Sequence, residues 1–445
     1  MITVSVAGRR VPLSPSIVVR TARAEVARTP RLLKAWYGLL LVLMGFGAAG
    51  AVQTIAPGAE SFGTSPSFEW GILIGAYVFF AITTSGLCLA SSLGTVFGID
   101  MFLPLEKRHA ILAVLTLTTA FGIIALDLHY PLRMAFGAVF NPSFSSPMWW
   151  MGAFYAGYLG FLLVEVWSLF TGHDQVHRWA CLASSCTAVV APSTLGAVFA
   201  VLFMRSYWYG LFTPLTMVVT ALLGGSALLG IVFYVVVRLR LAGFERGRRM
   251  AIPAVRILLV VGLAGSIALL GRSLLAGLTS DDAAMHGATM ALLNGPLAIW
   301  FWLRVGGGLA LPLVLLALPR TRTIGGTALA AGLAFVGVLI DRLLFVIAGQ
   351  IIPTTAVGGV VSQGFNAYTP SLVEISIVAG AFGLVAFVYT LAERYLDLSE
   401  SDVHIGFRLP AWAVRARTRM LARARLVVRL PLRRPVEASE TEGAR

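Results

Sequence analysis

The sequence predicts an all-α integral membrane protein with about ten transmembrane helices, and three observations carry this prediction. The chain of 445 residues is 58% hydrophobic, only 12% charged, and has a mean hydropathy of +0.85. Globular domains carry roughly 45–50% apolar and about 25% charged residues. Apolar stretches near or above the length needed to cross a bilayer recur along almost the whole chain. These features exclude an ordinary soluble fold.

Charged or Pro/Gly-rich breaks divide the apolar sequence into the predicted helices. These helices span residues 35–56, 69–98, 108–128, 148–170, 178–203, 211–238, 252–276, 289–318, 325–349 and 371–395. The fifth helix contains Pro192, which is tolerated because neighbouring groups in a membrane bundle satisfy the freed carbonyl. The predicted organisation is a basic N-terminal segment at 1–34, a transmembrane domain at 35–396 and a basic tail at 397–445.

Basic residues predict the sidedness of these helices. With the N-terminus in the cytoplasm, 29 of the 34 Lys and Arg residues fall on the cytoplasmic side. Cytoplasmic loops of membrane proteins carry an excess of Lys and Arg. Both termini are therefore predicted to be cytoplasmic. The net charge of +14 is then a topology signal, and nucleic acid is not an expected partner.

The basic tail has its own pattern at residues 410–430, where arginines alternate with apolar side chains such as Trp412 and Leu421. This pattern predicts an amphipathic helix on anionic lipid headgroups, with a solvated charge run as the alternative. No signal peptide is predicted, because more than 20 polar or mixed residues follow Arg9 and Arg10 before the first apolar run.

Ionisable groups in membrane spans are costly to bury and are therefore functional candidates. Polar and aromatic groups from distant segments converge on the predicted outer face: Glu69, Trp70, Asp127, His129, Tyr130, Arg133, Tyr368 and Glu374. Asp341 and Arg342 lie in the outer third of the ninth helix. Glu165 and Arg304 lie deeper, either as a structural ion pair or as steps in a proton path.

Each of these candidates also has a purely structural interpretation. Asp127 would accept hydrogen bonds near a helix end, Arg133 would anchor a lipid phosphate, and His129 would be an interfacial histidine. Further aromatic residues at the outer boundary are most simply an aromatic belt: Trp149, Trp150, Tyr155, Trp208 and Tyr209.

The histidines and cysteines predict that this chain holds no haem, metal ion or iron–sulfur cluster of its own. A b-type haem needs axial ligands at membrane depth, and the histidines fall outside that region. His173 and His177 have the spacing of a metal pair, but only Asp174 supports them. The three cysteines form no CxxC pair. Redox chemistry in this chain would therefore act on a lipid-soluble carrier.

Three motifs carry a resemblance to a known family. They are a Gly-Ala-aromatic helix with Ser-Gly-Leu at 85–87, Leu-Asp-Leu with a nearby proline at 126–131, and the SPMWWM opening at 146–151. The segments DRLLFVIAGQIIP and YTPSLVEISIVAGAFGLVAFVYTLAERYL agree with them. Together they resemble the NrfD/PsrC family of polysulfide reductase membrane subunits, over roughly residues 35–396.

This resemblance implies a quinone-reactive helical subunit without its own cofactor, built as two four-helix bundles with flanking helices. Its implied partners are an iron–sulfur ferredoxin-like subunit and a molybdopterin catalytic subunit or multihaem cytochrome. It implies a quinone pocket in the first bundle with Asp127 beside the headgroup. Arg342 and Glu374 match recurring polar positions of the second bundle. Where many members have Gly-Arg-Pro after the aspartate, this sequence has His129, Tyr130 and Pro131.

The leading hypothesis is a quinone-reactive subunit of a respiratory oxidoreductase in a bacterial cytoplasmic (inner) membrane. It would exchange electrons between the quinone or menaquinone pool and an iron–sulfur partner. Asp127 would accept the quinol proton at the outer face, with His129 as the alternative acceptor. Glu69 and Tyr130 would hydrogen-bond the other side of the headgroup.

Further hypotheses remain open. Residues that could form a proton path across the membrane are Glu165, Arg304, Asp341, Arg342 and Glu374. A secondary transporter of a small solute would also suit ten helices with a few buried charges. A passive anchor with a degenerate quinone site is the third alternative.

Overall fold

The computed structural model describes residues 3–6, 9–12, 31–55, 62–99, 101–102, 106–128, 140, 142–238, 245–353, 364–396 and 398. Within these ranges, ten helices are long and apolar enough to cross a membrane, which confirms the predicted multi-pass helical protein. Nine of these spans lie in single α-helices. Eight of the nine are α2 (Arg31–Ile55), α3 (Ile72–Thr95), α4 (Glu106–Asp127), α6 (Pro147–Thr171), α7 (Asp174–Ala200), α8 (Phe212–Arg238), α13 (Ile324–Ala348) and α14 (Leu372–Tyr395). The ninth lies in α9 (Glu245–Leu278), and the tenth is a composite helix at 298–317.

The predicted eighth helix, at 289–318, is wrong at its start, because the membrane span begins only at residue 298. A separate helix, α10 (Ala283–Leu293), ends before a turn, and the span then runs through α11 (Ala298–Leu303), the π-helix η2 (Arg304–Ala310) and α12 (Leu311–Ala317). The turn contains Asn-Gly-Pro at 294–296, a strong turn sequence. The 3₁₀ turn η3 (Pro319–Thr321) follows. Near the N-terminus, β1 (Thr3–Val6) and β2 (Arg9–Pro12) pair as an antiparallel hairpin that was not expected from the sequence.

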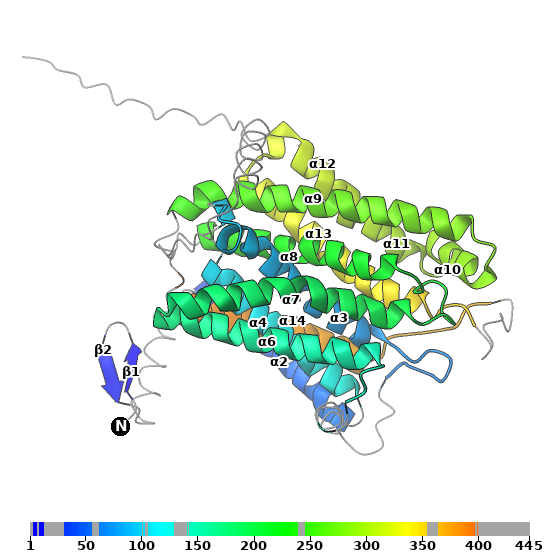
Figure 1. Cartoon of the computed structure of the whole chain (residues 1–445), viewed down its shortest axis with the longest axis horizontal. Helices are drawn as coiled ribbons and strands as arrows, with labels where there is room; N and C mark the ends of the chain where they lie inside the picture. The colour runs from blue at the N-terminus through cyan, green and yellow to red at the C-terminus, as the bar shows by residue number, and fades with distance from the viewer. Residues whose placement is uncertain are drawn as a thin grey trace, which may run out of the picture.

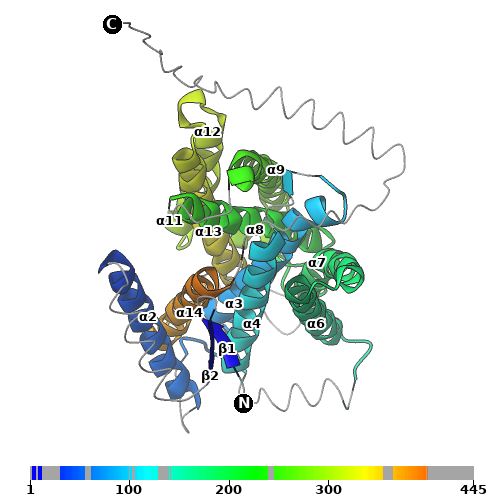
Figure 2. The same cartoon turned by 90° about the vertical axis from the view of Figure 1, so that its left-hand side faces the viewer.

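The helices form two four-helix bundles and a flanking pair (Figures 1 and 2). The first bundle contains α3, α4, α6 and α7, and the second contains α8, α9, α13 and the composite helix. The flanking pair is α2 and α14, with α14 packed on α4 and α2 outermost, as Figure 2 shows. This arrangement confirms the predicted bundles.

Close backbone contacts join these units at glycine residues. A Cβ added at Gly86 of α3 would overlap the carbonyl of Ala221 in α8, and Gly225 of α8 lies against the same turn of α3. In the flanking pair, a Cβ at Gly47 would lie 2.5 Å from the Cα of Gly380. Small residues at such positions allow membrane helices to approach closely. The Ser-Gly-Leu motif of α3 therefore lies at the interface between the bundles.

The alternating helix directions define two ends of the molecule. We call the end at which α4, α7 and α13 begin the basic end, because Lys107, Arg108, Arg178, Arg320 and Arg322 lie there. The opposite end, where α4 finishes, is the Asp127 end. That the basic end faces the cytoplasm stays a prediction, as do the domain boundaries. The predicted amphipathic helix at 410–430 lies outside the described residues.

Candidate functional site: an apolar groove that ends at Asp127

A groove of about 740 Å³ lies between the first bundle and the flanking pair. Helices α2, α4 and α14 supply nearly all of its lining: Met44, Gly47, Ala48, Ala51, Thr54, Ile55, Phe62, Thr118, Thr119, Gly122, Ile123, Ala125, Leu126, Asp127, Leu128, Ile377, Gly380, Ala381 and Leu384. The lining is mostly apolar, with three threonines and one carboxylate. At Gly122 an added Cβ meets no atom within 4 Å, so a larger side chain there would enter the groove. Its composition suits an elongated apolar ligand with a polar headgroup.

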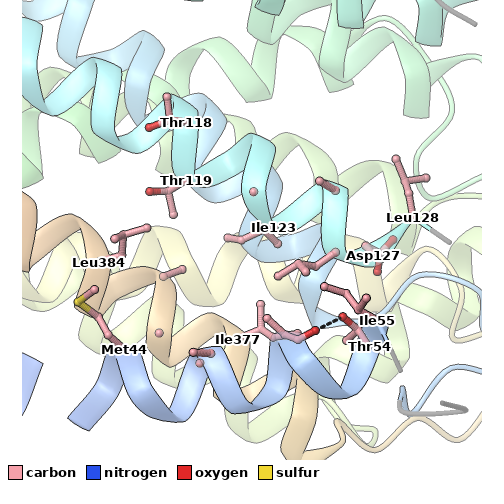
Figure 3. Close-up of a pocket in the computed structure, with 18 of the residues that line it drawn as sticks. Met44, Thr54, Ile55, Thr118, Thr119, Ile123, Asp127, Leu128, Ile377 and Leu384 are labelled. Atoms are coloured by element: carbon pink, nitrogen blue, oxygen red, sulfur yellow. Dashed lines mark hydrogen bonds between the residues drawn. The ribbon is translucent and has the colours of Figure 1, made fainter. Parts of the chain in front are cut away.

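Asp127 lies at one end of this groove, as Figure 3 shows. It is the last residue of α4 and is partly buried. Ile55 and Thr54 lie near it, whereas Met44 and Leu384 lie toward the other end. From Thr118 to Asp127 the lining follows α4 for about 14 Å, at ~1.5 Å of rise per residue. The groove therefore runs along the helices from an apolar end to a carboxylate.

A buried hydrogen-bonded cluster adjoins this end and is centred on Glu374. One oxygen of the Glu374 carboxylate accepts the backbone N–H of Gly63 (2.9 Å) and of Ser371 (2.8 Å). The other accepts the hydroxyl of Tyr368 (2.7 Å), and the Tyr368 oxygen accepts the N–H of Ile72 (2.8 Å). The cluster thereby ties the start of α3 to the start of α14.

The electrostatics of Tyr368 connect this cluster with the groove. Burial raises the pKa of the Tyr368 hydroxyl, and the hydrogen bond and negative charge of Glu374 raise it further. The negative charge of Asp127 acts in the same direction. Phe62 lines the groove and its neighbour Gly63 bonds to Glu374, so the cluster adjoins the lining. Two carboxylates and a neutral phenol thus gather at the Asp127 end.

The other residues predicted to contact a headgroup have different positions. Glu69 is exposed and does not line the groove. Trp70 also lies outside the lining, where its ring stacks on Trp208 (5.2 Å between centroids) and its backbone bonds in both directions with Gln350. His129, Tyr130 and Arg133 lie outside the described residues. Among the described candidates for headgroup contact, Asp127 alone lines the groove.

The aromatic-belt prediction is wrong for two residues. Tyr155 is 1% exposed and Trp208 is 2% exposed. Trp208 donates its indole N–H to the carbonyl of Phe345 (2.7 Å), because a buried indole needs an acceptor. Trp150 and Tyr209, by contrast, are exposed as a belt requires. Tyr155 and Trp208 therefore pack the core.

Of the two alternatives for Glu165 and Arg304, the mutual ion pair is wrong. Arg304 donates instead to Asp341 (2.6 Å), and Arg342 donates to the other oxygen of the same carboxylate. Arg342 is fully buried and also contacts Met217 of α8. Asp341 thus balances one of the two guanidinium charges within the second bundle. The π-helix η2 begins at Arg304, where the widened turn carries this side chain.

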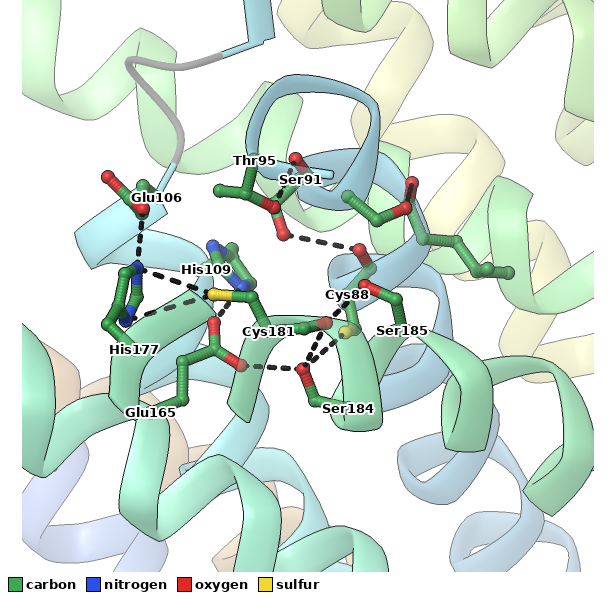
Figure 4. Close-up of polar contacts among 12 residues, drawn as sticks. Cys88, Ser91, Thr95, Glu106, His109, Glu165, His177, Cys181, Ser184 and Ser185 are labelled. Atoms are coloured by element: carbon green, nitrogen blue, oxygen red, sulfur yellow. Dashed lines mark hydrogen bonds and ion pairs between the residues drawn. The ribbon is translucent and has the colours of Figure 1, made fainter. Parts of the chain in front are cut away.

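Glu165 belongs to a separate network in the first bundle, shown in Figure 4. One oxygen of its carboxylate lies 3.0 Å from His109 Nε2, and the other accepts the hydroxyl of Ser184 (2.7 Å). All three residues are buried. The sequence places His109 at the start of the predicted helix 108–128, on the cytoplasmic side, and gives no sign of its contact with Glu165. The spacing of His109, Ala113 and Leu117 along one helix face would have indicated its burial.

A second histidine–carboxylate contact lies beside this network. His177 Nε2 is 2.7 Å from the Glu106 carboxylate and 3.3 Å from Cys181 Sγ. His173, the expected metal-binding neighbour of His177, is exposed and stacks on Trp167 (4.9 Å between centroids). Glu106 and Cys181 were not predicted as neighbours of His177, although the i, i+4 spacing of His177 and Cys181 is visible in the sequence.

The family model for polysulphide reductase, NrfD, matches residues 60–354 of this chain, well over half of it. The chain belongs to the NrfD family. This confirms the resemblance seen in the sequence motifs.

Three relatives of this NrfD protein are named as subunits of reductases and oxidoreductases, two of them as membrane subunits. A Halobacterium salinarum protein provisionally named as a dimethyl sulfoxide reductase membrane subunit is 26% identical over 419 residues, covering 86% of this chain and 95% of the relative. A selenate reductase subunit of Mesobacillus selenatarsenatis is 21% identical over 424 residues, covering 84% and 96%. The Hdr-like menaquinol oxidoreductase integral membrane subunit of Archaeoglobus fulgidus is 24% identical over 386 residues, covering 82% and 93%.

The NrfD match also divides the lining of the groove. Helix α4 with Asp127 lies inside the matched range, whereas α2 and α14 lie outside it. The groove is therefore formed where the flanking pair covers one face of the matched NrfD helices.

Proposed function

We propose that this NrfD protein is the quinone-reactive membrane subunit of a respiratory oxidoreductase complex and that quinol or quinone reacts at the Asp127 end of the groove. The observation that carries this proposal is the Asp127 carboxylate at one end of an otherwise apolar groove. The apolar walls would hold the isoprenoid tail, and the carboxylate would meet the headgroup. The name of the Archaeoglobus relative, a menaquinol oxidoreductase subunit, supports menaquinone as one candidate substrate.

In the direction of quinol oxidation, Asp127 acts as the proton acceptor. As one headgroup O–H bond breaks, its proton passes to the carboxylate oxygen, the proton of the second hydroxyl passes to water, and the two electrons leave for another polypeptide. A carboxylate at a helix end suits this role, because it can release the proton to water beyond the helix. Tyr368 and Glu374 hold the neighbouring backbone in place and so position this end of the groove.

Electron exchange requires partner subunits in this proposal. The relatives are named as subunits of reductases, which supports partner subunits in general. We propose that the partner is an iron–sulfur ferredoxin-like subunit, with a molybdopterin subunit or multihaem cytochrome beyond it, as the family resemblance implies. The partner would dock at the Asp127 end, because electrons move efficiently only over short distances. This end faces away from the cytoplasm if the positive-inside rule holds.

A proton path across the membrane is not needed for this chemistry. Glu165 is bonded to His109 and Ser184 in the first bundle, whereas Asp341 is bonded to two arginines in the second. The contacts among the described residues do not join these two groups into one path. The proposed function therefore rests on the groove alone.

Replacing Asp127 with Asn in the purified complex tests the proposal. Loss of a general base lowers rates by about 10²–10⁴-fold, and we expect that fall in quinol-dependent turnover. Co-purification of the partner subunits should be unchanged, because Asp127 faces the groove. Glu69→Gln is the matched control, since Glu69 is exposed and outside the lining. Near-normal turnover of Asp127→Asn would remove Asp127 from the mechanism.

A further inference from the structure

Three potential ligand side chains of different chemistry meet near the basic end, in the first turns of α4 and α7. Glu106 is the first residue of α4, and His177 and Cys181 follow one another by one turn of α7. One ligand atom from each residue lies within 4.8 Å of the other two. The three residues are buried, and Figure 4 shows their side chains pointing toward one another.

We infer that Glu106, His177 and Cys181 form a binding site for a divalent cation of the Zn²⁺ class. The inference rests on this juxtaposition and is independent of quinone chemistry at the other end of the molecule.

The donor set selects the class of cation. Imidazole nitrogen, thiolate sulfur and carboxylate oxygen are together the ligands of Zn²⁺ and of its analogues Co²⁺ and Cd²⁺. Ca²⁺ and Mg²⁺ instead require oxygen ligands. One carboxylate, one thiolate and a divalent cation also sum to zero charge, which suits a buried position between helices.

The spacing of the donor atoms is close to that of a coordination sphere. Around Zn²⁺, bond lengths of about 2.0–2.3 Å place neighbouring tetrahedral ligands roughly 3.4–3.8 Å apart. His177 Nε2 and Cys181 Sγ are 3.3 Å apart, already near this range. The Glu106 oxygen, at 2.7 Å from the same nitrogen, needs to retreat by less than about 1 Å. A change of side-chain torsion at the first residue of a helix supplies such a shift.

The neighbours of His177 orient its ring for this role. Ser168 donates its hydroxyl proton to the carbonyl of Glu165 (2.9 Å), so its oxygen accepts from His177 Nδ1 (3.2 Å). In this structure Nε2 donates to the Glu106 carboxylate, and a bound cation would replace that proton while the Nδ1 bond holds the ring in place. Metal-binding histidines are commonly oriented by such a bond from the second ring nitrogen. Three protein ligands leave the fourth position for water.

Thiolate-to-metal charge-transfer absorption of the purified full-length protein tests the inference directly, with Co²⁺ and Cd²⁺ as probes. We expect one equivalent of either ion to produce the charge-transfer band. Cys181→Ser should abolish it. Glu106→Gln and His177→Asn should each lower the affinity at least about 10–100-fold, the range typical of disturbed metal sites.

The chain supplies matched controls for this experiment. Cys88 and Cys186 are its other cysteines, and their double substitution by Ser should leave the band intact. His173→Asn tests for capture by an exposed histidine and should have no effect. Thermal unfolding distinguishes a variant that has lost a ligand from one that has misfolded, since only a folded variant unfolds cooperatively. Cd²⁺ should raise the Tm of the wild type and of the control variants but not that of Cys181→Ser.

Absence of the band in the wild type would overturn the inference. Persistence of the band in Cys181→Ser, or its loss in the Cys88/Cys186 double variant, would overturn it as well. In either case the three residues would be a hydrogen-bonded helix contact between α4 and α7.

Discussion

The carboxylate of Glu374 offers a strong test of the structure near the groove. It is 1% exposed and accepts three hydrogen bonds, from the backbone N–H groups of Gly63 and Ser371 and from the hydroxyl of Tyr368. Glu374→Gln keeps the shape of the side chain but removes its charge and one of its two acceptor oxygens. If the amide oxygen keeps both backbone N–H groups, the amide nitrogen faces Tyr368, and the hydroxyl proton of Tyr368 loses its acceptor.

The expected loss follows from those three bonds. A hydrogen bond to a charged group contributes about 1.5–3 kcal/mol, and one between neutral groups contributes about 0.5–1.5 kcal/mol. Conversion of the two backbone bonds from the first kind to the second, together with loss of the hydroxyl bond, therefore costs at least roughly 3 kcal/mol of unfolding free energy.

Unfolding of the purified protein in mixed micelles with increasing denaturing detergent measures this loss. Glu69→Gln is the matched control, because the same change at an exposed carboxylate should alter stability by about 0.5 kcal/mol or less. If Glu374→Gln unfolded together with that control, the inference that a charged Glu374 holds the starts of α3 and α14 would be refuted.

Two further substitutions test the groove and the second bundle. Gly122 lines the groove, and a Cβ there meets no atom within 4 Å. Gly122→Phe should therefore fill the groove and lower quinol-dependent turnover at least about tenfold, with little change in stability. Gly160→Phe on α6, equally open but outside the lining, should leave turnover unchanged, and equal rates for the two variants would contradict the assignment. Asp341→Asn leaves two buried arginines without their counter-charge and should cost about 3–5 kcal/mol in the same unfolding assay, whereas Asp281→Asn, at an exposed site, should cost little. A loss below ~1 kcal/mol for Asp341→Asn would show that the ion pairs are not maintained.

Contacts between distant helices account for the predictions that were wrong. Glu165 and Arg304 both looked deep, but depth along a helix does not reveal which bundle a residue faces. Each found another partner, His109 and Asp341 respectively. Trp208 was assigned to the boundary by its position after a helix, yet its side chain is buried against Trp70 and Phe345 although its neighbour Tyr209 is exposed. The Asn-Gly-Pro sequence at 294–296 signals the turn before α11, but the apolar residues on both sides of it led to the expectation of one continuous helix.

By itself, the sequence determined that this protein crosses the membrane many times, because hydropathy is a sum over consecutive residues and needs no knowledge of neighbours. It also placed Asp127 at a helix end, since a helix finishes where the apolar run does. Only the tertiary structure decided that Asp127 closes a groove against α2 and α14 and that Glu106 meets His177. Each residue turns a helix by about 100°, so the direction of a side chain depends on how the whole helix is rotated against its neighbours. That rotation is set by packing over the entire length of each helix, and no local stretch of sequence encodes it.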